Sequence, residues 1–497
     1  MSARADFLAV DLGAESGRVF LGSFDGERVH LQEIHRFPNV PVRVADGLHW
    51  DVLRIVHEVK EGLARAARES GNPASVGVDT WGVDFALLDR DGALVSNPYH
   101  YRDPRTEGMM ERAAERVPEE EIYRTTGIQF MPLNTLYQLL AFEDSLLLEA
   151  AYTLLMMPDL IGYWLTGEKA CEYTVATTTQ LYDLEAGDWA WELMRRMNIP
   201  ERIFPKIIQP GTQLGTLLPE VREGTGLGEV PVTAAATHDT ASAVVAMPAE
   251  GPFAYISSGT WSLVGVEMPH PVTTEGALHH NFTNEGGFGG TVRVLRNVMG
   301  LWLLQECRRT WVRNGRDYSY EELVRLAETA PQFGALVDPD HSGFLAPGDM
   351  PARVRDFCTK TGQNLGEEPG AVARCVFESL ALKYRWVLER AEEVSGQPAE
   401  TIHIVGGGAQ NTMLCRLTAD ATRRPVVAGP VEATALGNVM VQAYARGYVG
   451  SLEEIRDVVQ SSAEVQTYAP EDKADEWDEA FGRFSELMDA PLEGAVT

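Results

Sequence analysis

Residues 7–24 read FLAVDLGAESGRVFLGSF, and residues 253–267 read FAYISSGTWSLVGVE. Each stretch consists of an apolar segment, a short turn of glycine and small polar residues, and a second apolar segment, which is typical of a β-hairpin. The same pattern therefore opens two halves of the chain. Such an echo predicts a duplicated architecture with two related domains, each carrying a polar hairpin loop.

The chain length supports this division. A chain of 497 residues is longer than one hydrophobic core usually serves. We therefore predict an N-terminal domain over residues 1–245, a C-terminal domain over residues 246–475, a C-terminal helix and tail over residues 476–497, and a cleft between the two large domains. The boundary near residue 245 depends on the repeat, because no low-complexity linker marks it.

Periodicity predicts the main elements around the hairpins. Residues 7–34 form an antiparallel meander of three strands, and Asp51 caps a helix whose apolar stripe ends before Gly71. A strand and a hairpin with its tip at Asp91-Gly92 follow. The remaining predicted elements are mainly helical structure over 103–197, a strand over 230–236, a helix over 371–395 closed by Gly396, a strand at 401–405 that runs into three glycines, and a docked surface helix after residue 470 before a loose tail.

Composition and charge exclude several classes of protein. The hydrophobic fraction of 44% and the charged fraction of 23% are ordinary for a folded globular protein. The 42 basic and 72 acidic residues give a formal net charge of -30, which disfavours nucleic acid and anionic membranes as partners. An acidic protein can still bind a nucleotide where Mg²⁺ and backbone N–H groups supply a local positive field.

The N-terminus and the cysteines predict a cytoplasmic location. MSARADFLAVDLG lacks the features of a secretory signal, and no apolar run reaches membrane-spanning length. The five cysteines lack the close spacing of zinc sites and are interpreted as reduced thiols. Cys358 and Cys375 are near enough in sequence to be a redox-sensitive pair, although separate buried thiols are the simpler interpretation. The sequence carries no mark of the oligomeric state.

Three glycine-containing loops follow apolar strands. In the first, at residues 11–18, the glycines allow an anion to approach the backbone, and Asp11 could hold Mg²⁺ through water. Ser257-Ser258-Gly259-Thr260 supplies hydroxyls in the second half, and Gly406-Gly407-Gly408 could admit an adenine or a ribose. The alternatives are an ordinary hairpin, a polar turn and a packing device. A P-loop is disfavoured, because its lysine and its spacing are absent.

Asp239 lies in Thr237-His238-Asp239-Thr240-Ala241-Ser242, directly after a predicted strand and near the domain boundary. A carboxylate there could orient an acceptor hydroxyl and take its proton during phosphoryl transfer. The alternative interpretation is a helix N-cap, which Asp provides well. His238 is either a neighbouring ligand or a packed histidine.

Trp81 and Gly82 interrupt a strand pattern in Asp79-Thr80-Trp81-Gly82-Val83-Asp84. The indole could stack on the apolar face of a sugar while Gly82 allows close approach to the main chain. A core tryptophan beside a β-bulge is the alternative. Tyr101-Arg102-Asp103 and Asn297 are further polar candidates.

Together these motifs resemble the FGGY carbohydrate kinases over most of the chain. The resemblance is carried by AVDLGAESGRV, VGVDTWGVDFALLD, TGIQFMPLNTLYQL, THDTASAV, YISSGTWSLVG and HIVGGGAQN. It implies a two-domain α/β fold of the actin-like (ribonuclease H-like) ATPase class with an interdomain cleft that holds ATP and Mg²⁺. THDTASAV, DTWGVDF and GIQFMPLNTLYQL are similar to the branch that phosphorylates L-rhamnulose at O1, giving L-rhamnulose 1-phosphate and ADP in L-rhamnose catabolism.

The resemblance also implies roles for individual residues, with sugar contacts and the first phosphate loop in the N-terminal domain and ATP contacts in the C-terminal domain. Asp239 is the implied proton acceptor, and Asp11 helps to hold the metal. The implied ATP contacts are Ala14, Glu15, Ser16, Gly17, Arg18, Thr260, Gln305, Gly406, Gly407 and Gly408, and the implied sugar contacts are Gly82, His238, Asp239, Thr240 and Asn297. The stacking interpretation adds Trp81 to the sugar contacts. Glu15 departs from the family, which commonly has a small residue there. A carboxylate near a triphosphate is unfavourable unless it points at Mg²⁺ or away.

Two other functions are also consistent with these motifs. One is a kinase of another ketose, such as L-fuculose or a pentulose. The other is a non-catalytic actin-like ATPase or sugar sensor. A sensor of the transcriptional type would need a DNA-binding segment, and we expect none because the chain begins directly with its first phosphate-loop strand.

Overall fold

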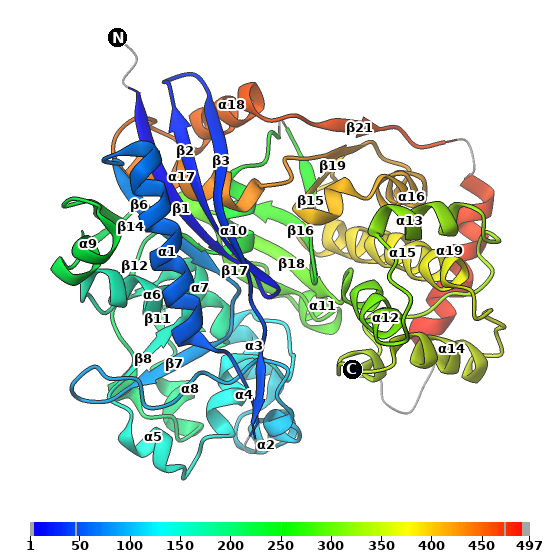
Figure 1. The fold of residues 1–497 in the computed structure, drawn as a ribbon. Coiled ribbons are helices and arrows are strands. Elements are labelled where there is room, and N and C mark those ends of the chain that lie inside the picture. Colours follow the sequence, from blue (N-terminus) through cyan, green and yellow to red (C-terminus); the bar gives the residue numbers. More distant parts are fainter. Residues whose placement is uncertain (1–3, 45–46, 250, 472–473, 490–497) are drawn as a thin grey trace. The chain divides into compact units, whose positions relative to one another are not determined.

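The computed structural model describes residues 4–44, 47–249, 251–471 and 474–489 (Figure 1). The chain divides into two compact α/β units, each built from separate stretches of sequence. The first unit comprises Met1–Ala249, Glu267–Val294 and Ala433–Ala463, and the second comprises Glu250–Val266, Leu295–Glu432 and Glu464–Thr497.

A six-stranded sheet is the centre of the first unit. Its order is β13-β14-β6-β1-β2-β3, with β1 at Ala5–Leu12, β2 at Ser16–Phe24, β3 at Val29–Pro38, β6 at Ser75–Thr80, β13 at Gln213–Thr216 and β14 at Pro231–His238. The predicted antiparallel meander is confirmed by the pairing of β1 with β2 and of β2 with β3. The strands β1, β6 and β14 run parallel, so their carboxyl ends lie at one edge of the sheet.

Two helices cover this sheet. The predicted first helix is α1 (Val52–Ser70), in which the Asp51 side chain accepts the Arg54 N–H and Gly71 forms the C-cap. Gly62 of α1 packs on Val19, whereas Gly22 packs on Val439 of α17 (Ala433–Ala445). Side chains alternate between the faces of a strand, and Val19 and Gly22 differ in parity. The two helices therefore cover opposite faces of β2.

Helices and short strands fill the rest of the first unit. The segment that follows β6 does not continue in the main sheet, because β7 (Phe85–Leu88) pairs with β8 (Thr153–Met156). The predicted tip at Asp91-Gly92 is a tight turn in which Gly92 has a φ of 82°. The predicted helical region contains α2 (Met109–Arg116), α3 (Glu119–Thr126), α4 (Thr135–Leu140), α5 (Leu146–Ala150), α6 (Met157–Thr166), α7 (Tyr173–Ala176) and α8 (Trp191–Arg196).

The second unit repeats the arrangement of the first hairpin. Strands β15 (Phe253–Ser258) and β16 (Ser262–Met268) are antiparallel, and β19 (Thr401–Val405) lies parallel beside β15, as β6 lies beside β1. The sheet continues through β20 (Val426–Ala428) to β21 (Gln466–Tyr468). The pairing pattern therefore agrees with the sequence echo that predicted a duplication.

Long helices surround this second sheet. The predicted helix closed by Gly396 is α15 (Pro369–Ser395), and the others include α12 (Trp302–Arg313), α14 (Met350–Lys360) and α16 (Thr412–Thr422). The predicted docked helix is α19 (Ala474–Asp489), which buries Trp477 and Phe484. The predicted loose tail, residues 490–497, lies outside the described residues.

Candidate active site

The carboxyl ends of β1, β6 and β14 bring acidic side chains together in the first unit. Asp11 of β1 is in register with Asp79 of β6, and Thr80 is in register with His238 of β14, directly before Asp239. The sequence predicts functional roles for Asp11 and Asp239. It predicts none for Asp79, although Asp79 also comes near the end of an apolar strand.

The first loop lies beside Asp11. Arg18 donates to Asp11 across 2.5 Å, so two of the residues implied by the family resemblance form an ion pair. Ala14, Glu15 and Ser16 are half-buried in a turn closed by a hydrogen bond from Gly13 N–H to the Ser16 carbonyl. The Asn39 side chain donates to the Gly13 carbonyl, and its N–H donates to the Glu15 carbonyl. Asn39 is thus a supporting residue that the sequence analysis missed.

Asp79 is fully buried between its neighbours. Its Oδ2 accepts a hydrogen bond from Asn438 Nδ2 at 2.5 Å, and its Oδ1 has no hydrogen-bond partner among the described residues. Burial and then the nearby charge of Asp11 raise the pKa of Asp79 well above its usual range. A buried carboxylate with an unsatisfied oxygen is costly, which suits a site that receives a cation or a donor from a ligand.

Asp239 is the first residue of α10 (Asp239–Val245), and the N-cap position belongs to His238. Its side chain is 28% exposed. Oδ1 accepts hydrogen bonds from the Thr240 N–H at 2.6 Å and from the Thr240 hydroxyl at 3.2 Å. Burial raises the pKa of Asp239, while His238 and these donors oppose that shift. Asp239 therefore has an oriented carboxylate that keeps some access to solvent.

His238 connects Asp239 to two buried charged residues that the sequence analysis missed. Its Nε2 lies 3.3 Å from Asp239 Oδ1. On the other side, Nδ1 lies 3.1 Å from Arg293 Nη2 and 3.3 Å from Glu285 Oε2. Arg293 and Glu285 form an ion pair at 3.1 Å.

Trp81 is held in an aromatic cluster. Its ring packs on Trp50 with a centroid separation of 4.3 Å, and only 6% of the residue is exposed. The indole N–H groups of Trp81 and Trp50 both donate to Asp84 Oδ2, at 3.0 and 2.6 Å. Gly82 is half-buried next to Thr178, whose side chain would lie 3.0 Å from an added Cβ. The structure therefore places Trp81 as a packed tryptophan with little free surface.

In the second unit, the turn between β15 and β16 is fixed to the start of α12. The N–H groups of Leu301 and Trp302 donate to the carbonyls of Gly259 and Thr260 at 3.1 Å each. Gln305 follows one turn later on the same helix. Thr260 and Gln305 therefore belong to one hydrogen-bonded substructure.

The three glycines pack against the same turn. A Cβ at Gly408 would lie 2.0 Å from the Ser258 hydroxyl, and a Cβ at Gly406 would lie 3.0 Å from the Ser258 carbonyl. No atom lies within 4 Å of a Cβ placed at Gly407. Tyr384 of α15 closes the arrangement by sharing a hydrogen bond with the Ser262 hydroxyl at 2.6 Å.

Asn297 lies near the end of β18 (Val292–Val298), in a segment anchored by a buried lysine. Lys383, which is fully buried, lies 2.9 Å from Asp338 and 2.9 Å from Asp340. Asp340 in turn accepts the Met299 N–H at 2.8 Å. Lys383 and Tyr384 are adjacent on α15, so one helix supports both the Asn297 segment and the Ser262 turn.

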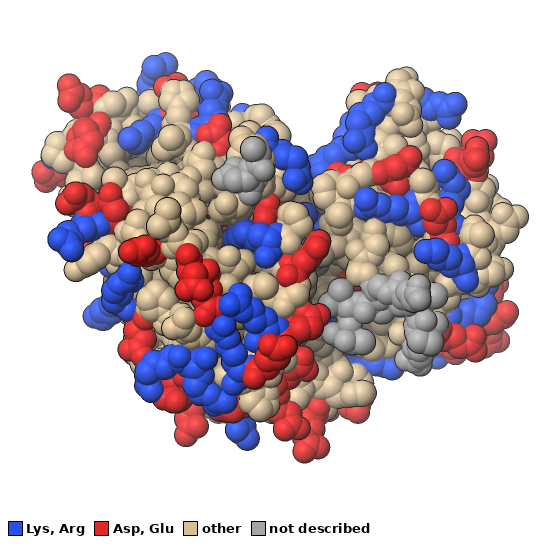
Figure 2. Space-filling model, turned by 90° about the horizontal axis from the view of Figure 1, so that it is seen from below, with Lys and Arg blue, Asp and Glu red and all other residues tan. Residues whose placement is uncertain are grey.

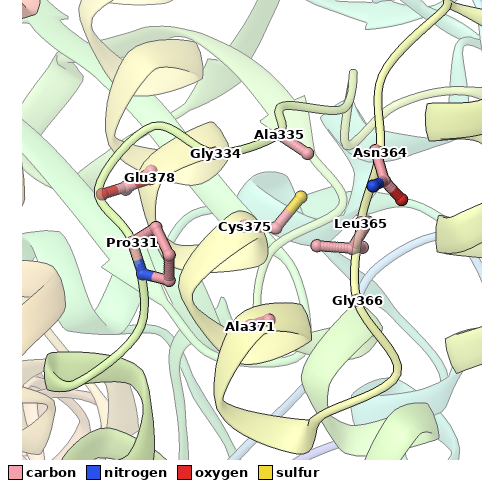
Figure 3. A pocket seen from close by; sticks show the side chains of 9 residues that line it. All are labelled: Pro331, Gly334, Ala335, Asn364, Leu365, Gly366, Ala371, Cys375 and Glu378. Carbon is pink, nitrogen blue, oxygen red and sulfur yellow. The ribbon is translucent and has the colours of Figure 1, made fainter.

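A small pocket elsewhere in the second unit is separate from these residues. It has a volume of about 90 Å³ and is lined by Pro331, Gly334, Ala335, Asn364, Leu365, Gly366, Ala371, Cys375 and Glu378 (Figure 3). Cys375 and Ala371 reach it from α15. Hydrogen bonding to Cys358 raises the pKa of the Cys375 thiol, so the two thiols are neighbours in space. All five cysteines are buried and free.

The distribution of charge is mixed. Figure 2 shows basic and acidic side chains interspersed over the visible face, although the net charge is -30. Within the described ranges, no helix combines the length and apolar composition needed to cross a membrane. No group of three or more His, Cys, Asp or Glu side chains in the described part of the chain is arranged to hold a metal ion directly.

Comparison with known proteins agrees with this geometry. Residues 7–246 match the model for the N-terminal domain of the FGGY family of carbohydrate kinases, and residues 254–446 match the model for its C-terminal domain. The rhamnulokinase of Bacteroides thetaiotaomicron is 46% identical over 98% of this chain and 100% of the relative. The rhamnulokinase of Oceanobacillus iheyensis is 41% identical over 93% and 98%, respectively.

Solved structures show the same fold at low sequence identity. The gluconate kinase from Lactobacillus acidophilus superposes with a TM-score of 0.81 at 18% identity, covering 98% of each chain. The xylulose kinase from the same organism has a TM-score of 0.81 at 18% identity, covering 97% of this chain and 98% of that one. The predicted two-domain α/β fold class is therefore confirmed as that of the sugar kinases.

Proposed function

Because this chain belongs to the FGGY family of carbohydrate kinases, we propose that it transfers the γ-phosphoryl group of ATP to O1 of L-rhamnulose. The products are L-rhamnulose 1-phosphate and ADP, in L-rhamnose catabolism. Relatives named rhamnulokinase that align over nearly the whole chain support this substrate. Since the reaction consumes ATP, we place it in the cytoplasm.

The single observation that carries the proposal is the state of Asp239. Its Oδ1 is held by Thr240, and its raised pKa makes the carboxylate a better proton acceptor than an ordinary surface aspartate. In the proposed reaction Asp239 orients the O1 hydroxyl of the sugar. It takes the hydroxyl proton as the bond to the γ-phosphorus forms and the bond to the β,γ-bridging oxygen breaks.

The residues proposed to bind ATP occur in both units. In the second unit they are Thr260, Gln305 and the Gly406–Gly408 loop, where the exposed Gly407 has open space beside it that suits close approach by a ligand. In the first unit they are residues 14–18, with Arg18 supplying positive charge to the phosphates. We retain as proposals the domain bounds 1–245 and 246–475.

The proposed Mg²⁺ fits the acidic edge of the first sheet. Asp79 Oδ1 is buried without a hydrogen-bond partner, and Asp11 lies in register beside it. We propose that Asp11 holds the ion through water. When bound, Mg²⁺ neutralises the charge that develops on the phosphate oxygens.

The sugar is proposed to contact Trp81, Gly82, His238, Asp239, Thr240 and Asn297. Only 6% of Trp81 is exposed, so it contributes shape more than stacking area. His238 and Thr240 lie on either side of Asp239 in the sequence, and hydrogen bonds to Arg293 and Asp239 position their side chains.

The test is a panel of ketoses. Purified protein is incubated with ATP, Mg²⁺ and L-rhamnulose, L-fuculose, L-ribulose or D-xylulose, and ADP release is measured against a control without sugar. We expect L-rhamnulose to be among the best acceptors. A preference for a pentulose would change the assigned substrate. ADP release that does not depend on sugar would overturn the kinase assignment in favour of an ATPase.

A further inference from the structure

Arg293 is a fully buried arginine to which neither the family resemblance nor the proposed reaction assigns a role. It lies on β18 within the first unit and has no exposed surface. Its Nε donates to the Gly286 carbonyl at 3.0 Å, and its Nη2 reaches both Glu285 and His238. Burying a guanidinium is unfavourable unless it is paired and hydrogen-bonded, so the contacts of Nε and Nη2 offset its burial, while Nη1 has no hydrogen-bond partner among the described residues.

The contact with His238 determines which ring nitrogen carries the proton. Arginine is always charged and has only donors. At 3.1 Å from Arg293 Nη2, His238 Nδ1 must therefore accept a hydrogen bond. A neutral imidazole whose Nδ1 accepts carries its proton on Nε2. The Nε2–H group then lies 3.3 Å from Asp239 Oδ1.

Glu285 offers the competing arrangement, in which Nδ1–H donates to Oε2 at 3.3 Å. That arrangement would direct an N–H of His238 at an N–H of Arg293. It would also leave a bare Nε2 facing the Asp239 carboxylate. Glu285 instead has Arg293 as its closer partner, at 3.1 Å, which neutralises its charge.

The tautomer of His238 determines how the two oxygens of the Asp239 carboxylate are used. The donors from Thr240 and the Nε2–H of His238 all approach Oδ1. Among the described residues, the polar contacts of the Asp239 side chain all involve Oδ1, and the side chain keeps 28% of its surface exposed. Oδ2 is therefore the oxygen that remains for an incoming hydroxyl proton.

We propose that Arg293 is a positioning residue for Asp239. Acting through His238, it fixes the tautomer whose Nε2–H faces Oδ1 and so reserves Oδ2 for the sugar hydroxyl. This inference rests on the proposed function, because it assumes that Asp239 is the base. Glu285 keeps Arg293 in place and compensates its charge.

The first test reads the tautomer directly and does not depend on activity. Protein labelled with ¹⁵N-histidine is measured by NMR, and the His238 signals are assigned by their loss in His238→Gln. We expect Nε2 to be protonated and Nδ1 to be bare in the unmodified protein. In Arg293→Leu, where Glu285 becomes the nearest polar group, we expect Nδ1 to become protonated. A protonated Nδ1 in the unmodified protein would overturn the proposal.

The second test separates positioning from stability. In Arg293→Leu we expect kcat to fall by about 10- to 10²-fold, part of what a general base contributes, with KM for the ketose nearly unchanged. Arg293→Gln keeps a neutral donor and should recover most of that loss. Arg456→Gln, which removes an arginine paired with Glu267 at 2.7 Å, is the matched control.

The outcomes are distinguishable. An unchanged kcat in folded Arg293→Leu, or equal losses in Arg293→Gln and Arg293→Leu, would contradict a positioning role. If Arg293→Leu does not fold, the tautomer in the unmodified protein and the activity of Arg293→Gln decide the matter. If no ketose is phosphorylated by the unmodified protein, the proposed function fails, whereas the tautomer measurement still tests the His238 assignment.

Discussion

In the first unit, Asp11 lies near the end of β1, just before the turn of the β1–β2 hairpin. Asp79 and Asp239 lie at the same edge of the sheet. In the second unit the β15–β16 hairpin has the same strand pairing, but Ser258 ends its first strand and packs on Gly406 and Gly408, and its turn begins with Gly259 and Thr260. The same hairpin arrangement therefore lies beside carboxylates in the first unit and beside hydroxyls and glycines in the second unit.

This difference separates two chemical tasks that phosphoryl transfer requires. Carboxylates can accept a proton and attract a cation, but they repel phosphate oxygens at short range. Hydroxyls and exposed N–H groups can approach phosphate without that repulsion. Considered by itself, the edge of the first unit's sheet is suited to proton transfer and to a cation, and the hairpin turn of the second unit is suited to uncharged contacts with phosphate.

The strongest test of this comparison is Asp239→Asn. Asparagine keeps the shape and the acceptor oxygen, but it cannot take a proton, so we expect kcat to fall by roughly 10²- to 10⁴-fold. KM for the ketose should change little. Steady-state kinetics with Asp457→Asn, an exposed aspartate, as the control checks the result. Near-normal turnover in Asp239→Asn would show that Asp239 is not the base.

The second prediction concerns the pH dependence of the stability of the first unit, which contains Asp84. Burial raises the pKa of Asp84 from 3.8 to about 6. The folded protein therefore favours protonated Asp84, and this stabilisation is complete below about pH 4 and lost as the pH rises through about 6. The pKa difference corresponds to about 3 kcal/mol.

Denaturant unfolding at several pH values tests this sign. Relative to Asp84→Asn, the unmodified protein should lose stability between about pH 4 and about pH 7, because the variant lacks the ionisation. Asp457→Asn should follow the unmodified protein. Parallel curves for Asp84→Asn and the unmodified protein would show that Asp84 ionises in the folded state as it does in water.

In the Gly406–Gly408 loop of the second unit, Gly408→Ala and Gly407→Ala are a matched pair of variants. A methyl group at Gly408 would lie 2.0 Å from the Ser258 hydroxyl, whereas one at Gly407 meets open space. We expect Gly408→Ala to lower the free energy of unfolding by about 1–3 kcal/mol and Gly407→Ala to leave it nearly unchanged. Equal unfolding curves would show that the glycine loop does not depend on its packing against Ser258.

The smallest expected effect is that of Tyr384→Phe. Removing the hydroxyl leaves the buried Ser262 without its partner at 2.6 Å, at a cost of about 1 kcal/mol. Because Ser262 ends the turn that carries Thr260, we expect KM for ATP to rise more than KM for the ketose. A larger change for the ketose would place this turn with the sugar instead of the nucleotide.

Much of the fold could be predicted because local signals agreed with the tertiary structure. The meander, the Asp51 and Gly71 caps of α1 and the Gly396 stop of α15 all depend on short-range periodicity and capping. The separation of β7 from the main sheet could not be predicted, because its partner β8 lies more than sixty residues away in sequence. Strand partners at such distances leave no local mark.

Local sequence patterns predict the two hairpins and the glycine loops, and the family motifs predict the candidate residues Asp11, His238 and Asp239. How the Asp239 carboxylate is oriented depends on tertiary contacts. Its local sequence permits an N-cap, but His238 occupies that position. Arg293 and Glu285 reach His238 from positions about fifty residues later in the chain. The orientation of a carboxylate depends on contacts of this kind, which form when Glu285 and Arg293 fold into the same unit as β14.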